Sequence, residues 1–129
     1  MDEKRRSPRQ EFLSKQKIVR LDAGQTPVDS VVMTKDFSSS GLKVITSEKL
    51  VTSNEILVCL NDQLKEMLKT NDARLIRSGK MYLSKIVWSK QHQDGYEHGI
   101  DFITKEKSSP ELLETFTELV NASILSQFN

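Results

Sequence analysis

The sequence has little cysteine, little net charge and no long apolar run. Cys59, the only cysteine, cannot form an internal disulfide, and its place in the apolar run 56–60 predicts a small buried side chain in a reducing compartment. The formal net charge of +1 provides no overall field that attracts nucleic acid or a membrane. Since no apolar run has the length of a signal peptide or a bilayer span, we expect a cytoplasmic protein without membrane contact.

Aromatic residues and metal ligands are also scarce. Aromatic residues make up 6% of the chain, and Trp88, Phe102 and Phe116 fall at core positions of their predicted elements. A barrel that binds single-stranded nucleic acid needs exposed aromatic side chains, so nucleic-acid binding stays a weaker alternative. One cysteine and two histidines form no recognisable metal-ligand set, and no sequence signature links a general base to the serines at 38–40. We therefore expect neither an enzyme nor a bound metal or cofactor.

What the sequence does contain is a regular strand pattern. A length of 129 residues with 36% hydrophobic and 29% charged residues predicts one domain with a single core. Apolar or alternating segments separated by turn-forming residues predict six strands, at residues 17–21, 28–35, 42–45, 55–60, 80–89 and 96–103. Their spacing predicts a mainly β fold, a six-stranded antiparallel barrel. Helical spacing of apolar residues within 61–72 indicates a short helix, and we assign no role to residues 61–79.

The two ends of the sequence differ from the strand pattern. Apolar residues recur at helical spacing from Leu112 to Ile124, with Ser109 as the N-cap, which predicts a C-terminal helix. Residues 1–16 are polar, charged and interrupted by a proline. We therefore divide the chain into a flexible N-terminal arm, 1–16, and a barrel domain with its C-terminal helix, 17–129.

The arm carries most of the local positive charge. Among the first twenty residues, seven Lys or Arg side chains face three Asp or Glu side chains, a local charge of +4. Arg5, Arg6 and Arg9 lie close together, and three residues separate Arg5 from Arg9. A guanidinium group binds phosphate oxygens in pairs, stacks on purine rings and matches the O6 and N7 acceptors of guanine. The arm is a candidate nucleotide-binding segment, and an ordinary solvated basic tail is the alternative.

A second polar motif, Asp36-Phe37-Ser38-Ser39-Ser40-Gly41, follows the second predicted strand. A carboxylate such as that of Asp36 can accept hydrogen bonds from the N1 and N2 donors of guanine, and the Ser38 hydroxyl can bind phosphate or base. Gly41 lets the backbone turn where a side chain would clash. The alternative is a turn closed by local side-chain hydrogen bonds.

Taken together, the two motifs resemble the signatures of the PilZ domain family, whose members are bacterial receptors for cyclic di-GMP built on a six-stranded barrel. The spacing Arg5-x-x-x-Arg9 and the pattern Asp36-x-Ser38-x-x-Gly41 occur in the family's order and at a similar separation. Residues 85–88 and 99–102 are similar to its last two barrel strands, and a terminal helix is also usual. The resemblance covers nearly the whole chain.

The resemblance implies a receptor for cyclic di-GMP and a role for each matching residue. Arg5 and Arg9 would hold phosphates and guanine edges, with Arg6 assisting. Asp36 and Ser38 would contact a guanine from the barrel surface, Gly41 would keep the turn open, and the arm would fold over the ligand. The output would pass to an unidentified effector protein or through self-association. A nucleotide-independent interaction module of the same fold remains an alternative function.

Overall fold

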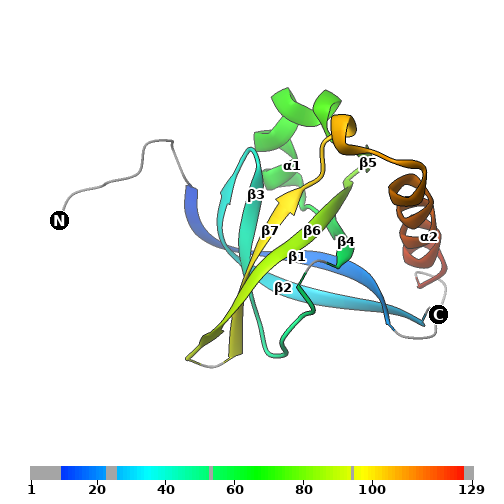
Figure 1. The fold of residues 1–129 in the computed structure, drawn as a ribbon. Coiled ribbons are helices and arrows are strands. Elements are labelled where there is room, and N and C mark those ends of the chain that lie inside the picture. Colours follow the sequence, from blue (N-terminus) through cyan, green and yellow to red (C-terminus); the bar gives the residue numbers. More distant parts are fainter. Residues whose placement is uncertain (1–9, 23–25, 53, 94, 127–129) are drawn as a thin grey trace.

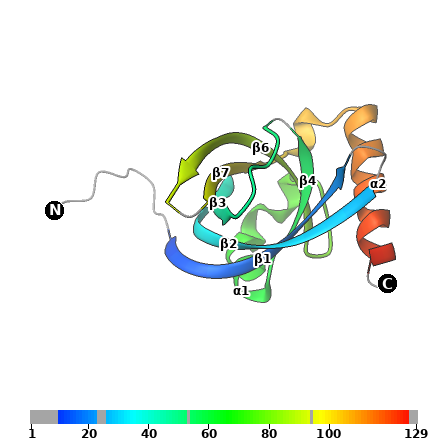
Figure 2. The same ribbon diagram turned by 90° about the horizontal axis from the view of Figure 1, so that it is seen from below.

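The computed structural model describes residues 10–22, 26–52, 54–93 and 95–126. Six antiparallel strands pair in the closed order β1-β2-β3-β7-β6-β4, because β4 pairs with both β6 and β1. The ring that they form is visible from below in Figure 2. The predicted six-stranded antiparallel barrel is therefore confirmed. Its strands are β1 (Gln10–Asp22), β2 (Thr26–Ser38), β3 (Gly41–Thr46), β4 (Glu55–Cys59), β6 (Met81–His92) and β7 (Gly95–Phe102), and β5 (Arg77–Ser78) adds a short pairing to β6.

Strand β1 begins earlier than the sequence predicted. Residues 10–16, which we expected in the arm, form its first half and pair with the end of β2. These residues are mostly polar and lack an apolar side chain at every second position, so they gave no strand signal. Their backbone hydrogen bonds to β2 nevertheless hold them in the strand. A register shift between Glu11 and Ser14 further interrupts the alternation that would have revealed the strand.

Two apolar layers explain where the helices lie. Inside the barrel, side chains from each of the six barrel strands form one buried cluster, and Leu64 and Leu68 of α1 (Asp62–Leu68) belong to it. Helix α1 therefore closes one end of the barrel, as Figure 1 shows. Outside the barrel, Leu57 and Leu83 pack with Leu119 of α2 (Pro110–Ser126). Strand β4 is thus buried on both faces, which accounts for its continuous apolar run.

The C-terminal helix starts where the sequence predicted. The hydroxyl of Ser109 accepts a hydrogen bond from the backbone N–H of Leu112 at 3.1 Å. A short 3₁₀ helix, η2 (Lys105–Lys107), links β7 to this helix. Among the described residues, no helix has the length and apolar character needed to cross a membrane.

The segment between β4 and β6, residues 61–80, is called the cap below. It consists of α1, the 3₁₀ helix η1 (Lys69–Arg74) and β5. The Asn61 side chain caps α1 by accepting from the backbone N–H of Leu64 at 3.0 Å, and its amide donates to the Ser14 hydroxyl at 2.7 Å. These bonds fasten the cap to β1.

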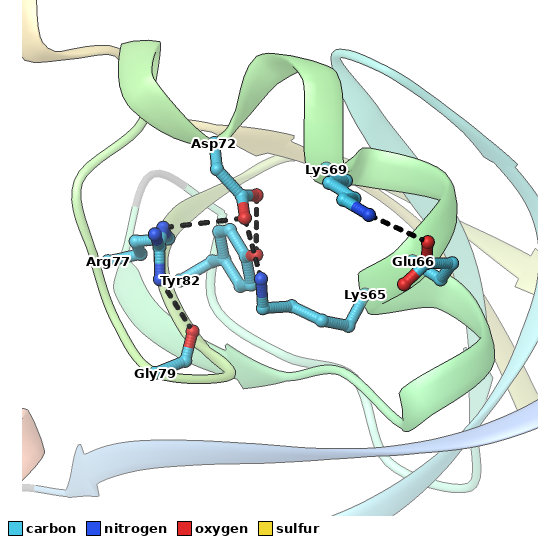
Figure 3. A network of polar contacts seen from close by, with 7 residues as sticks. All are labelled: Lys65, Glu66, Lys69, Asp72, Arg77, Gly79 and Tyr82. Carbon is cyan, nitrogen blue, oxygen red and sulfur yellow. Dashed lines mark hydrogen bonds and ion pairs between the residues drawn. The ribbon is translucent and has the colours of Figure 1, made fainter.

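A network of polar side chains around the buried Asp72 and Tyr82 ties the cap to the barrel (Figure 3). Asp72 accepts hydrogen bonds from Lys65 at 2.6 Å and from the Tyr82 hydroxyl at 2.7 Å, and Arg77 lies 3.6 Å away. Burial alone would raise the pKa of Asp72, but the bonds from Lys65 and Tyr82 outweigh it and hold that pKa below its ordinary value. Burial, with the bond to ionised Asp72, raises the pKa of Tyr82 well above its ordinary value, so Tyr82 remains a donor.

Candidate functional site

The second sequence motif forms the hairpin between β2 and β3. Ser38 pairs with Gly41, so Ser39 and Ser40 make a two-residue turn. The Ser38 hydroxyl accepts from the backbone N–H of Ser40 at 3.3 Å and lies 3.2 Å from the Ser40 hydroxyl. The local hydrogen bonds considered for this motif therefore do form. They leave the side chains of Ser39 and Ser40 exposed at the tip of the hairpin.

A bulge in β2 decides which side chains of the motif point outward. Thr34 pairs with Val44 and Asp36 pairs with Lys43, so Lys35 is an extra residue in β2. The shift puts Phe37 into the barrel core, where it is 3% exposed. Because successive strand residues face opposite sides, Asp36 and Ser38 share the outer face.

Asp36 is buried although it belongs to the outer face. Its side chain is 4% exposed, and the ammonium group of Lys43, on the neighbouring strand β3, lies 3.9 Å from one carboxylate oxygen. At this distance Lys43 and Asp36 form an ion pair but no direct hydrogen bond to each other. A ligand that bonds to Asp36 must therefore replace some of the neighbours that now enclose the carboxylate.

Gly41 allows the hairpin to lie against β7. A Cβ atom at Gly41 would be 2.1 Å from the carbonyl oxygen of Ile100. The backbone N–H of Phe102 donates to the carbonyl of Ser40 at 3.0 Å, which fixes the hairpin beside the end of β7. We expected Gly41 to keep the turn open. The structure gives a reason for the glycine, because no side chain fits between the two strands at this position, and the role of Gly41 toward a ligand stays a prediction.

Trp88 lines the candidate site, although the sequence analysis wrongly assigned it to the core. In the pairing of β6 with β7, Ile86 faces Ile100 and Trp88 faces Gly99, so Val87 is an extra residue. This second bulge turns the Trp88 side chain to the outer face, where it is half-buried. A Cβ at Gly99 would lie 2.1 Å from the indole Nε1, so the ring rests directly on the glycine. A glycine inside a predicted strand was the available signal for such a close approach.

Trp88 and the hairpin line a shallow pocket of about 90 Å³, called the Trp88 pocket below. It combines an indole ring, serine hydroxyls, the Lys43 ammonium group and the Asp101 carboxylate. Such a surface can stack on a base and offers both donors and acceptors to its edge. The pocket is lined by Ser38, Ser40, Gly41, Leu42, Lys43, Trp88, Gly99, Ile100 and Asp101.

The three arginines of the first motif, Arg5, Arg6 and Arg9, lie outside the described residues. The described chain begins at Gln10, whose backbone pairs with Phe37, and Glu11 pairs with Asp36. The arginine-bearing segment therefore joins β1 beside the β2 residues of the second motif. This connection agrees with a joint site, and the contacts of the arginines themselves stay a prediction.

His98 occupies a separate polar cluster. Its ring nitrogens lie 2.7 Å from the hydroxyl of Ser89 and 2.9 Å from that of Thr46. Burial lowers the pKa of His98 despite an opposing backbone contact from Glu48, so the ring is neutral. Within the described part of the chain, no group of three His, Cys, Asp or Glu side chains could hold a metal ion.

Comparison with known proteins identifies the family to which the chain belongs. A search of curated proteins gives no significant match. The PilZ domain of CeSA, from a cellulose-synthesising bacterium, has 13% identity and a TM-score of 0.43 over 88% of this chain and 92% of that one. The PilZ domain of YcgR from Escherichia coli, solved with c-di-GMP, has 10% identity and a TM-score of 0.45 over 97% and 95%. The PilZ domain family model matches residues 3–119, so the chain belongs to the PilZ domain family.

Proposed function

We propose that this chain is a receptor for cyclic di-GMP and performs no reaction. The observation that carries the proposal is that Ser38, Gly41 and Trp88, from three strands, meet on one outer surface beside the start of β1. This surface joins an aromatic ring to hydroxyl and charged groups, as a guanine base with its phosphates requires. Membership of the PilZ family makes cyclic di-GMP the nucleotide to test.

Each group has a role in the proposed complex. The indole of Trp88 stacks on one guanine, and the Ser38 hydroxyl exchanges its bond within the turn for a bond to the ligand. Asp36 accepts from the guanine N1 and N2 donors after the surface above it opens. Arg5 and Arg9, from the segment that joins β1 at this place, bind the phosphates. A rearrangement at Asp36 is therefore part of binding.

Trp88 provides a direct test, because it is the only tryptophan of the chain. Titration with cyclic di-GMP should change its fluorescence, whereas GTP and cyclic di-AMP should leave it unchanged. Calorimetry on the same samples gives the affinity. If the unaltered protein neither releases heat nor changes its emission with cyclic di-GMP at micromolar concentration, the receptor proposal is wrong.

Substitutions locate the binding surface. Arg9→Ala and Asp36→Ala should each weaken binding by about tenfold or more, since each removes a contact to a charged group worth roughly 1.5–3 kcal/mol. Asp62→Ala is the matched control, because it removes an exposed carboxylate of α1 that does not line the Trp88 pocket. Equal affinities for Asp36→Ala and Asp62→Ala would show that the nucleotide binds elsewhere.

We also propose that the bound nucleotide changes a surface that a partner recognises. The ligand would connect the segment before Gln10 to the barrel, and this new arrangement would engage or release an effector protein or a second copy of the chain. Sedimentation with and without cyclic di-GMP tests self-association. Affinity capture with and without cyclic di-GMP tests for an effector. If the nucleotide changes neither the sedimentation nor the set of captured proteins, the proposed relay of the signal is wrong.

A further inference from the structure

A second pocket lies between the tip of the β2–β3 hairpin and η1. Its volume is about 190 Å³, and its lining includes Ser39 and Ser40 of the hairpin, Asn71 and Arg74 of η1, and Thr104 after β7. Ser40 also lines the Trp88 pocket, so the two pockets are neighbours that share a residue. We call this space the η1 pocket.

The only charged side chain that lines the η1 pocket is the exposed Arg74. Every other cation of the cap has an acidic partner. Lys65 and Arg77 lie beside Asp72, Lys69 pairs with Glu66, and Lys80 pairs with Asp62. In contrast, Arg74 has no such partner among the described residues. Its guanidinium group is thus available to an anion.

Thr104 supplies a second sign of an unfilled contact. Its hydroxyl oxygen is buried and has no hydrogen-bond partner within the described part of the chain. Leaving a buried hydroxyl without a partner has an energetic cost, and a rotation of the Thr104 side chain toward a group bound in the pocket would remove that cost. Hydroxyl groups of Ser39 and Ser40 and the Asn71 amide complete a set of donors, and no carboxylate lines the pocket.

We propose that the η1 pocket is an extension of the nucleotide site and holds a phosphate group of the ligand bound at the Trp88 pocket. This inference rests on the proposed function. A guanidinium group with several neutral donors suits phosphate oxygens. The volume of about 190 Å³ is below the roughly 300–1,000 Å³ of pockets that enclose a drug-sized ligand, so the space fits one group of a nucleotide. The cap thereby contributes Arg74 as a binding residue.

Calorimetry with cyclic di-GMP on two charge-removing variants tests this role. Arg74→Gln should weaken binding by about tenfold or more. Lys69→Gln is the matched control: it removes a cation from the same 3₁₀ helix, but its exposed pairing with Glu66 lies outside the pocket, so affinity should change by less than about twofold. Equal effects of the two variants, with binding by the unaltered protein intact, overturn this inference alone. No binding by the unaltered protein overturns the proposed function as well.

Thr104→Val separates ligand contact from fold maintenance. The substitution keeps the shape of the side chain and removes a hydroxyl that lacks a partner, so the free protein should keep or gain thermal stability. Binding of cyclic di-GMP should nevertheless weaken by several-fold, roughly the effect of losing one neutral hydrogen bond. Unchanged affinity would remove Thr104 from the site.

A final experiment tests whether the anion in the η1 pocket is a phosphate group of the nucleotide or free phosphate. The side-chain amide signals of Asn71 should shift in NMR spectra when cyclic di-GMP binds. Inorganic phosphate alone is the comparison probe. A shift with inorganic phosphate, together with unchanged cyclic di-GMP affinity in Arg74→Gln, would make the pocket an independent anion site and overturn its place in the nucleotide site.

Discussion

The cap and the Trp88 pocket use polar residues in opposite ways. In the cap, the carboxylate of Asp72 is enclosed by donors from α1, β5 and β6, so the polar atoms satisfy one another (Figure 3). The lining of the Trp88 pocket instead includes two glycines, Gly41 and Gly99, at which an added Cβ would clash with β7 or with the Trp88 ring. The comparison indicates that the cap is sensitive to losing atoms, whereas the Trp88 pocket is sensitive to gaining them.

The largest effect should follow from removing the centre of the cap network. Asp72→Ala leaves the Tyr82 hydroxyl buried without its acceptor and takes away the partner of Lys65, so we expect a loss of about 2–4 kcal/mol in the free energy of unfolding. Urea denaturation measures it. Glu66→Ala breaks only an exposed ion pair and should change stability by less than about 1 kcal/mol. Equal losses would contradict the role of the network.

The same carboxylate predicts a dependence of stability on pH. The pKa of Asp72 in the folded protein lies below its ordinary value of 3.8, so the unfolded chain takes up a proton first as the pH falls. The ionised Asp72 carboxylate contributes its full stabilisation of the fold at a pH above its pKa in the unfolded chain. This contribution is lost as the pH falls from there through the pKa of Asp72 in the folded protein. Unfolding curves from neutral pH to below pH 4 should therefore show a decline that Asp72→Asn reduces. An identical decline in the variant would assign the acid sensitivity to other carboxylates.

The next largest effect should come from adding one methyl group to a glycine that lines the Trp88 pocket. In Gly41→Ala, the new Cβ meets the carbonyl oxygen of Ile100, and backbone of β7 cannot move as a side chain can. We expect a loss of about 1–3 kcal/mol in stability and weaker binding of cyclic di-GMP. In Gly99→Ala, the methyl group meets the Trp88 ring instead, so the emission of the free protein should change. A stable Gly41→Ala variant with full affinity would contradict the close packing of the hairpin on β7.

The comparison also explains how much the sequence could predict. Alternating apolar residues such as Leu42 and Val44 of β3, which face the barrel interior, identify strands because one face of such a strand must be apolar. The motif predicted Asp36 and Ser38 as site residues, and the structure brings Ser38 together with Gly41 in one pocket. Local patterns of this kind can be recognised in the sequence because they arise within one strand or one turn.

Features that depend on distant segments could not be predicted. Trp88 was assigned to the core because an unbroken period of two places it there, and only the bulge at Val87 reverses its direction. No local sequence pattern marks Arg74 as a binding residue. Its proposed role depends on the hairpin that lies beside it in space and on the acidic partners that the other cations of the cap have. The pairing of Asp72 with Tyr82 joins η1 to β6 and leaves no periodic pattern.

The smallest effects come from removing one hydroxyl from each region, and they should have opposite signs. The Tyr82 hydroxyl donates to Asp72, so Tyr82→Phe should lower stability by about 1–2 kcal/mol. Thr34 lies on β2, four residues before the Ser38 that lines the Trp88 pocket; it is fully buried, and its hydroxyl has no hydrogen-bond partner among the described residues. Thr34→Val should therefore leave stability unchanged or raise it by up to about 1 kcal/mol. Urea denaturation of both variants at neutral pH measures the contrast. A loss of stability in both would mean that Thr34 has a partner in solution, and that its hydroxyl is satisfied as the polar groups of the cap are.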